Sequence, residues 1–240
     1  MSAVRDASLA SVHPNVWHAD ALATPAGRVL ATGDATLNAQ LPGGGWPLGA
    51  LSEILQPDGV HSEWRLLLPA LARSGTAAVV LVGAPHMPFG PALHAQGLRP
   101  QRLLWVQAQA SAQRLWAAEQ ALRCAEVDAV LAWLPQARAD QLRRLQMAAA
   151  EYDKLLWVLR PEQALHESSP AVLRLWAGPV GPSAHGGDSS DALEVRVLKR
   201  RGPPLQQALR LGARAASLAR LLAASQPGQG HALDCATACA

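Results

Sequence analysis

The sequence predicts an α/β fold in which helices cover a mainly parallel β-sheet. Half of the 240 residues are hydrophobic and 16% are charged, a balance that supplies a core and argues against disorder. Short apolar runs alternate with helical patterns, which is the layout of strands joined by crossover helices. The middle runs are apolar on both faces, as buried parallel strands are.

Seven apolar runs are predicted as strands, with three helices between them. The strands are expected at residues 50–55, 76–83, 102–106, 128–134, 154–160, 169–179 and 192–200. The helices are expected at residues 61–75, 111–126 and 138–152. The Gly/Ser-rich stretch 181–191 has little to bury and is predicted to be a flexible loop.

The composition divides the chain into three parts. These are an N-terminal helical segment (1–40), an α/β core (41–202), and a basic amphipathic helix with a disordered tail (203–240). The last helix is predicted over residues 205–222, because Arg210 and Arg214 share one face of a helical wheel and small residues share the opposite face.

Residues 56–63, with the sequence QPDGVHSE, occupy the place of a phosphate-binding loop between a strand and a helix. They have the eight-residue length of G-x-x-x-x-G-K-[ST]. The glycine positions hold Gln56 and His61, the lysine position holds Ser62, and the hydroxyl position holds Glu63. A working loop needs the glycines for inward-facing N–H groups, the lysine for the terminal phosphates and the hydroxyl for magnesium.

Three interpretations of this loop follow, the last of which is ATP hydrolysis. In the first it is only a strand-to-helix turn, with Gly59 in the turn, Ser62 as helix N-cap and Glu63 in the first turn. The second is residual nucleotide binding. Against it, Asp58 and Glu63 place acids beside the phosphate position. A carboxylate about 4 Å from a phosphate charge costs about 1 kcal/mol in water and about 4 kcal/mol at an effective dielectric constant near 20.

No catalytic, metal-binding or cofactor-binding pattern accompanies the altered loop. The C-terminal end of the predicted strand 128–134 carries Trp133 and is followed by Pro135. It has no aspartate that could reach magnesium. No Ser-His-Asp or Cys-His spacing is present, and the three cysteines suggest neither a disulfide framework nor a metal site. The sequence therefore predicts a protein that is not an enzyme and holds no metal or cofactor.

The charge is distributed unevenly along the chain. Residues 1–195 carry fourteen Arg or Lys against seventeen Asp or Glu, whereas residues 196–240 carry seven basic residues against one acid. The candidate surface for DNA or an acidic partner comprises Lys199, Arg200, Arg201, Arg210, Arg214 and Arg220. The alternative is a solvated helix face without a partner.

The remaining expectations concern location and tryptophans. No apolar run reaches about 18 residues and the N-terminus lacks a signal-peptide pattern, so a cytoplasmic protein without membrane association is expected. Trp105, Trp116, Trp133 and Trp157 are expected in the core. Trp17 and Trp46 are candidate exposed anchors for a partner.

A family resemblance extends over most of residues 13–202. Residues 41–55, LPGGGWPLGALSEIL, resemble the segment before the phosphate loop in the RecA recombinase family. More closely, the chain resembles the ImuA family, RecA- and SulA-like proteins associated with translesion DNA synthesis. The matching segments, in order, are 13–22, 32–47, 103–108, 121–135, 142–151, 169–176 and 198–202.

The resemblance implies a RecA-like, P-loop NTPase-like fold with a degenerate phosphate loop and no ATP chemistry. It also implies a damage-induced (SOS) accessory protein that binds an ImuB-type Y-family polymerase homologue and an error-prone replicative-type polymerase assembly. RecA and a weak DNA contact are further candidate interactions. The alternatives are a SulA-like cell-division inhibitor and a weak nucleotide- or DNA-binding switch.

Overall fold

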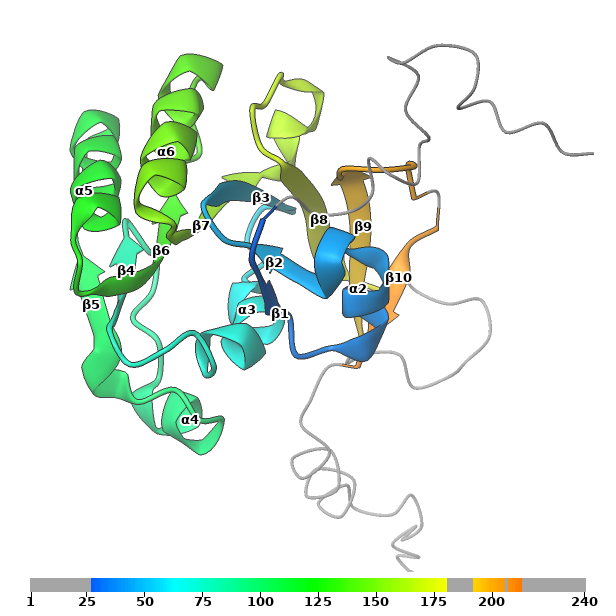
Figure 1. Ribbon diagram of the computed structural model, residues 1–240, viewed down its shortest axis with the longest axis horizontal. Helices are drawn as coiled ribbons and strands as arrows, with labels where there is room; N and C mark the ends of the chain where they lie inside the picture. Colours follow the sequence, from blue (N-terminus) through cyan, green and yellow to red (C-terminus); the bar gives the residue numbers. More distant parts are fainter. Residues whose placement is uncertain (1–26, 181–191, 206, 213–240) are drawn as a thin grey trace, which may run out of the picture.

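An eight-stranded sheet organises the part of the chain that the computed structural model describes, namely residues 27–180, 192–205 and 207–212. Its strand order is β10-β9-β8-β3-β7-β6-β4-β5 (Figure 1). From β8 to β5 all neighbouring strands are parallel, and β9 and β10 add two antiparallel strands at one side. The strands are β3 (Ala50–Gln56), β4 (Ala78–Val82), β5 (Leu103–Val106), β6 (Val127–Trp133), β7 (Leu155–Pro161), β8 (Leu173–Pro179), β9 (Leu193–Lys199) and β10 (Leu209–Leu211).

Helices cover both faces of the sheet, as the alternating pattern predicts. On one face α2 (Ala35–Gln40), α3 (Glu63–Leu71) and α4 (Gly90–Ala95) contribute to an apolar cluster with Ile54 and Trp157. On the other face α5 (Ser111–Arg123) and α6 (Ala139–Tyr152) lie side by side and pack on residues such as Leu51 and Val130 (Figure 1). Short 3-10 turns complete the framework: η2 (Pro42–Gly44), η3 (Pro100–Arg102) and η4 (Glu162–His166). The predicted α/β class with a mostly parallel sheet is confirmed.

Strand β3 lies inside the sheet and is buried along its whole length. It pairs in parallel with β7 on one side and β8 on the other. Because parallel strands all begin at one edge of the sheet and end at the other, we call these the amino edge and the carboxyl edge. The loop after β3 therefore meets the loops after β4, β5, β6 and β7 at the carboxyl edge.

A small antiparallel pair precedes the sheet and buries a tryptophan. Strand β1 (Val29–Ala31) pairs with β2 (Gly45–Pro47). A Cβ at Gly45 would lie 2.3 Å from the Leu30 carbonyl oxygen, so the close approach of the two strands requires glycine there. Next in the chain, Trp46 is fully buried and meets Trp157 edge-to-face, with ring centroids 5.7 Å apart at 87°.

The prediction of a helix over residues 205–222 is wrong at its start, because Leu209–Leu211 is strand β10. Its leucines point inward and Arg210 is exposed, a two-residue alternation that fits a strand. Leu209 and Leu211 pair with Val195 and Leu193 of β9. Strand β10 thus hydrogen-bonds backbone groups of β9 that would otherwise be unpaired on its outer side. The rest of the predicted helix, residues 213–222, lies outside the described residues.

Other expectations about the ends of the chain and the tryptophans also change. Within the expected helical segment 1–40 the described residues include strand β1 as well as helix α2, and residues 1–26 lie outside the description, as does the predicted loop 181–191. Trp116 is 65% exposed on the outer face of α5 and is not a core residue. Trp46, expected as an exposed anchor, belongs to the core. None of the helices in the described ranges has the length and apolar character that a bilayer crossing requires.

The opposite environments of Trp46 and Trp116 predict opposite effects on stability. Replacement of Trp46 by alanine removes a buried ring and its contact with Trp157, so we expect the free energy of unfolding to fall by about 3–5 kcal/mol. The matched control, Trp116→Ala, should change it by about 0.5 kcal/mol or less. Urea denaturation followed by circular dichroism measures both, and equal losses would contradict the described packing.

Candidate functional site

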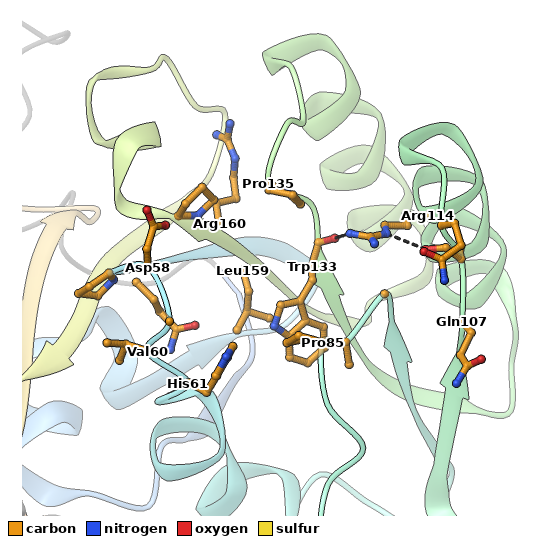
Figure 2. Close-up of a pocket in the computed structure, with 18 of the residues that line it drawn as sticks. Asp58, Val60, His61, Pro85, Gln107, Arg114, Trp133, Pro135, Leu159 and Arg160 are labelled. Carbon is orange, nitrogen blue, oxygen red and sulfur yellow. Dashed lines mark hydrogen bonds between the residues drawn. The ribbon is translucent and has the colours of Figure 1, made fainter.

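Five loops at the carboxyl edge enclose a cleft of about 540 Å³ (Figure 2). The loops follow β3, β4, β5, β6 and β7. In Figure 2 Trp133 lies in the middle of the cleft, between His61 on the β3 side and Arg114 on the α5 side. Ligands of open α/β sheets bind outside the carboxyl ends of the strands, so this cleft is the position where a nucleotide would be expected.

The loop after β3 closes on itself as a tight turn. The Val60 backbone N–H donates to the Pro57 carbonyl oxygen at 3.1 Å. Gly59 has φ = 73°, a left-handed conformation that explains the glycine without any ligand. A phosphate-binding loop instead turns successive N–H groups toward the anion, and here the Val60 N–H is already used within the turn.

The start of helix α3 is capped by a side chain from the end of β3. The Gln56 carboxamide is best oriented with its oxygen, and not its NH₂ group, toward the backbone N–H groups of α3. Its oxygen then accepts from the Ser62 N–H at 2.8 Å and the Glu63 N–H at 3.3 Å. The opposite orientation gives only a 3.4 Å contact from its amide nitrogen to the Glu63 carboxylate. Ser62 occupies the predicted N-cap position, but its hydroxyl makes no capping bond. Gln56 therefore fills the place at the helix N-terminus that an anion would take.

The acids and histidines of the loop also engage one another or neighbouring residues. Asp58 accepts a hydrogen bond from the Gln163 side chain at 2.6 Å. His61 lies with Nδ1 4.0 Å from the buried Glu63 carboxylate and meets His86 edge-to-face at 4.8 Å. The loop therefore brings the carboxylate of Asp58, and no lysine, to the cleft, while Glu63 is buried beside it.

Both arginines that line the cleft are committed to protein atoms. Arg114 donates from Nε to the Ala108 carbonyl at 2.8 Å and from Nη1 to the Trp133 carbonyl at 3.3 Å, as the dashed lines in Figure 2 show. Arg160 points to carboxylates: Nη1 lies 2.9 Å from Glu53 and Nη2 lies 2.6 Å from Glu167. Among the described lining residues, these two supply the arginine or lysine side chains. Carboxylates balance the charge of Arg160, whereas carbonyl oxygens only orient Arg114.

Behind the cleft, Glu53 forms a buried charge cluster that sequence reasoning did not identify. Glu53 is fully buried in β3 and accepts from Arg160 of β7 and, at 2.7 Å, from Arg174 of β8. Arg174 also donates to the Leu165 carbonyl of η4 at 3.0 Å. With Glu167 the four side chains balance two negative and two positive charges. The available signal was a single charge inside each of three apolar runs, LSEIL, WVLRP and VLRLW.

The predicted basic residues do not form one surface. Lys199 is the last residue of β9, and Arg200 and Arg201 follow it. These three lie at the amino edge, away from the cleft, because β9 runs antiparallel to β8. Arg210 pairs across the β9–β10 ladder with Glu194, toward the carboxyl edge. The other two candidates, Arg214 and Arg220, lie outside the described residues.

Part of the chain is similar to a protein of known function. The chain is 32% identical over 112 residues to the cell division inhibitor SulA of Photorhabdus laumondii. The aligned part is 46% of this chain and 63% of that protein's length. No model of a known protein family matches the chain. The similarity links the chain to a SulA-like protein, and the fold places it among mostly parallel α/β proteins.

The buried cluster leads to a stability prediction. Replacement of Glu53 by glutamine keeps the shape but removes the negative charge between two buried arginines, so the free energy of unfolding should fall by about 3–5 kcal/mol. The matched control is Glu167→Gln. That carboxylate is 55% exposed, so its loss should cost about 0–1 kcal/mol. Chemical denaturation compares the two, and a control as destabilised as the Glu53 variant would contradict the cluster.

Proposed function

We propose that this protein is a non-catalytic binding factor of the DNA-damage response that acts through contacts with other proteins. The observation that carries the proposal is the state of the cleft. Three N–H groups of the loop are satisfied within the protein, that of Val60 by the turn and those of Ser62 and Glu63 by Gln56. Carboxylates balance the charge of Arg160, one of the two arginines that line the cleft. A RecA-like frame with this loop would lack the donors and cations that phosphoryl transfer requires.

The first candidate role is that of an accessory protein in damage-induced translesion DNA synthesis. It rests on the resemblance to the ImuA family, whose matching segments run in order through most of residues 13–202. In this role the partners are an ImuB-type Y-family polymerase homologue and the mutagenic polymerase assembly. We place this candidate first because the resemblance includes β8 and the end of β9 as well as the helices and strands before them.

The second candidate role is inhibition of cell division through binding of the tubulin-like division protein. The similarity to the inhibitor SulA favours it, although the match covers less than half of the chain. Both candidates are binding roles in the same cellular response, and neither requires a nucleotide. Direct tests with the two partners separate them.

Exposed apolar side chains on β5 and just before α4 support a protein-binding role. In the described part of the chain β5 pairs with β4 alone, which makes it an edge strand. Leu104 in β5 is 54% exposed. Met87 and Phe89, just before α4, are 69% and 71% exposed. Leu104 pairs with Val80 and so shares the side of the sheet that α5 and α6 cover, whereas α4 packs on the other side. Exposed apolar side chains of this size are typical of surfaces that other proteins cover.

We expect the purified protein to show no steady-state ATP hydrolysis above the buffer rate, with or without single-stranded DNA. The physical reason is that Ser62 stands where the phosphate-neutralising lysine belongs and Glu63 where the magnesium-binding hydroxyl belongs. A coupled phosphate-release assay measures this. Turnover that disappears in a Glu63→Ala variant would show that the loop is catalytic and would refute the proposal.

We also expect capture of the ImuB-type partner from cells after DNA damage, dependent on the exposed apolar side chains before α4. A Met87→Ser/Phe89→Ser variant should bind the partner at least about 30-fold more weakly, because loss of a central hot spot costs about 2 kcal/mol or more. Met147→Ser, a 65% exposed site on α6, is the control and should bind normally. Capture of the division tubulin instead would favour the second candidate. Equal loss in the control would exclude this surface.

A further inference from the structure

A second groove, of about 530 Å³, opens at the amino edge of the sheet, on the opposite side from the cleft. It is formed by the start of the β1–β2 pair, the turn that enters β3, the segment before β8 and the end of β9. The lining includes four basic side chains, Arg28, Lys199, Arg200 and Arg201, and no acidic or aromatic residue. The fold therefore brings Arg28 to a cluster about 170 residues further along the sequence.

Three of these four cations lack a neutralising carboxylate. Arg28 pairs with Asp153. Lys199 donates to the Ser169 carbonyl oxygen at 3.0 Å, and Arg200 donates to the carbonyl oxygens of Pro203 and Gln40. These bonds orient the side chains but leave their charges unbalanced. Arg201 is exposed, and in the described ranges none of the three forms an ion pair.

The floor of the groove is aliphatic. Its apolar members include Val29, Pro42, Pro47, Leu48 and Val172, the last of which is 41% exposed. Cations around an aliphatic floor suit a ligand that carries carboxylates and small apolar side chains in close succession. Specific pockets combine an apolar lining with a few placed polar groups in this way.

We propose that this groove binds an acidic peptide segment of another protein. Unbalanced positive charge selects the acidic side chains, and the aliphatic floor takes the apolar ones between them. A nucleic-acid strand fits less well, because proteins that bind single strands stack the bases on aromatic rings and none lines this groove.

The chain's own segments outside the described ranges do not match this ligand. Residues 1–26 hold one arginine and two aspartates, and residues 213–240 hold two arginines and one aspartate. Residues 181–191 contain two aspartates and no basic residue, but they connect Val180 to Ala192 at the carboxyl edge, the opposite edge of the sheet. An acidic segment of a partner is therefore the occupant.

The test measures fluorescence anisotropy with a labelled twelve-residue peptide that alternates Asp or Glu with Leu or Val. Its Asn/Gln analogue and a twelve-nucleotide oligothymidylate serve as competing probes. The protein is the full chain, either unchanged or with Lys199→Gln/Arg201→Gln. The matched control, Arg73→Gln/Arg143→Gln, removes two exposed positive charges on α6 and just after α3. A second groove variant, Val172→Asp, places an acid in the floor, and circular dichroism checks that all variants fold.

The acidic peptide should bind more tightly than either competing probe. The Lys199/Arg201 variant should weaken binding about 2- to 30-fold, the range for two exposed charge pairs, and the control should not. Val172→Asp should weaken it as well. The proposal fails if the groove and control variants weaken binding equally, if neither groove variant weakens it, or if the oligonucleotide binds more tightly and loses affinity in the groove variants.

Discussion

The pairing of Glu53 with Arg160 and Arg174 is the constraint on which the rest of the structure depends. A fully buried carboxylate in the central strand is tolerated only when paired and hydrogen-bonded. The two arginines come from β7 and β8, the strands on either side of β3, and Arg174 also anchors η4. The same pairing turns Arg160 inward, so one of the two cations near the cleft is removed from it. The pairing that stabilises the sheet thus also balances the charge of Arg160 at the cleft.

The loop after β3 also satisfies its own polar groups within the protein. Its place between a buried strand and a helix is the place of a phosphate loop, but Gln56 supplies from within the protein the acceptor that a phosphate would supply from outside. Because Gln56 already accepts from the first N–H groups of α3, these groups do not require an anion. The binding roles that we propose fall to other surfaces: the exposed Met87 and Phe89 before α4, and the basic groove at the amino edge.

The sequence predicted the seven long strands of the sheet and the helices α3, α5 and α6, because buried parallel strands and crossover helices leave strong apolar patterns.

The sequence predictions failed where tertiary contacts determine the structure. Leu209–Leu211 is too short to show the two-residue alternation of a strand. It forms a strand because it pairs with β9. Trp46 follows three glycines, which suggested an exposed turn. The β1–β2 pair instead places its ring against Trp157. Gln56 was predicted as a lost glycine; its capping role depends on a rotamer that no pattern encodes. The Glu53 cluster joins residues more than 100 positions apart.

Direct observation of nucleotide at the loop tests the central claim that this cleft is closed to phosphate. The measurement is a titration of ¹⁵N-labelled protein with Mg–ATP up to several times its cellular concentration, followed through the backbone amide signals of Gly59, Val60, Ser62 and Glu63. We expect these signals not to move, because the Val60 N–H is already bound to Pro57 and those of Ser62 and Glu63 are bound to Gln56. Saturable shifts confined to these four amides would show that the loop holds phosphate and would contradict the claim.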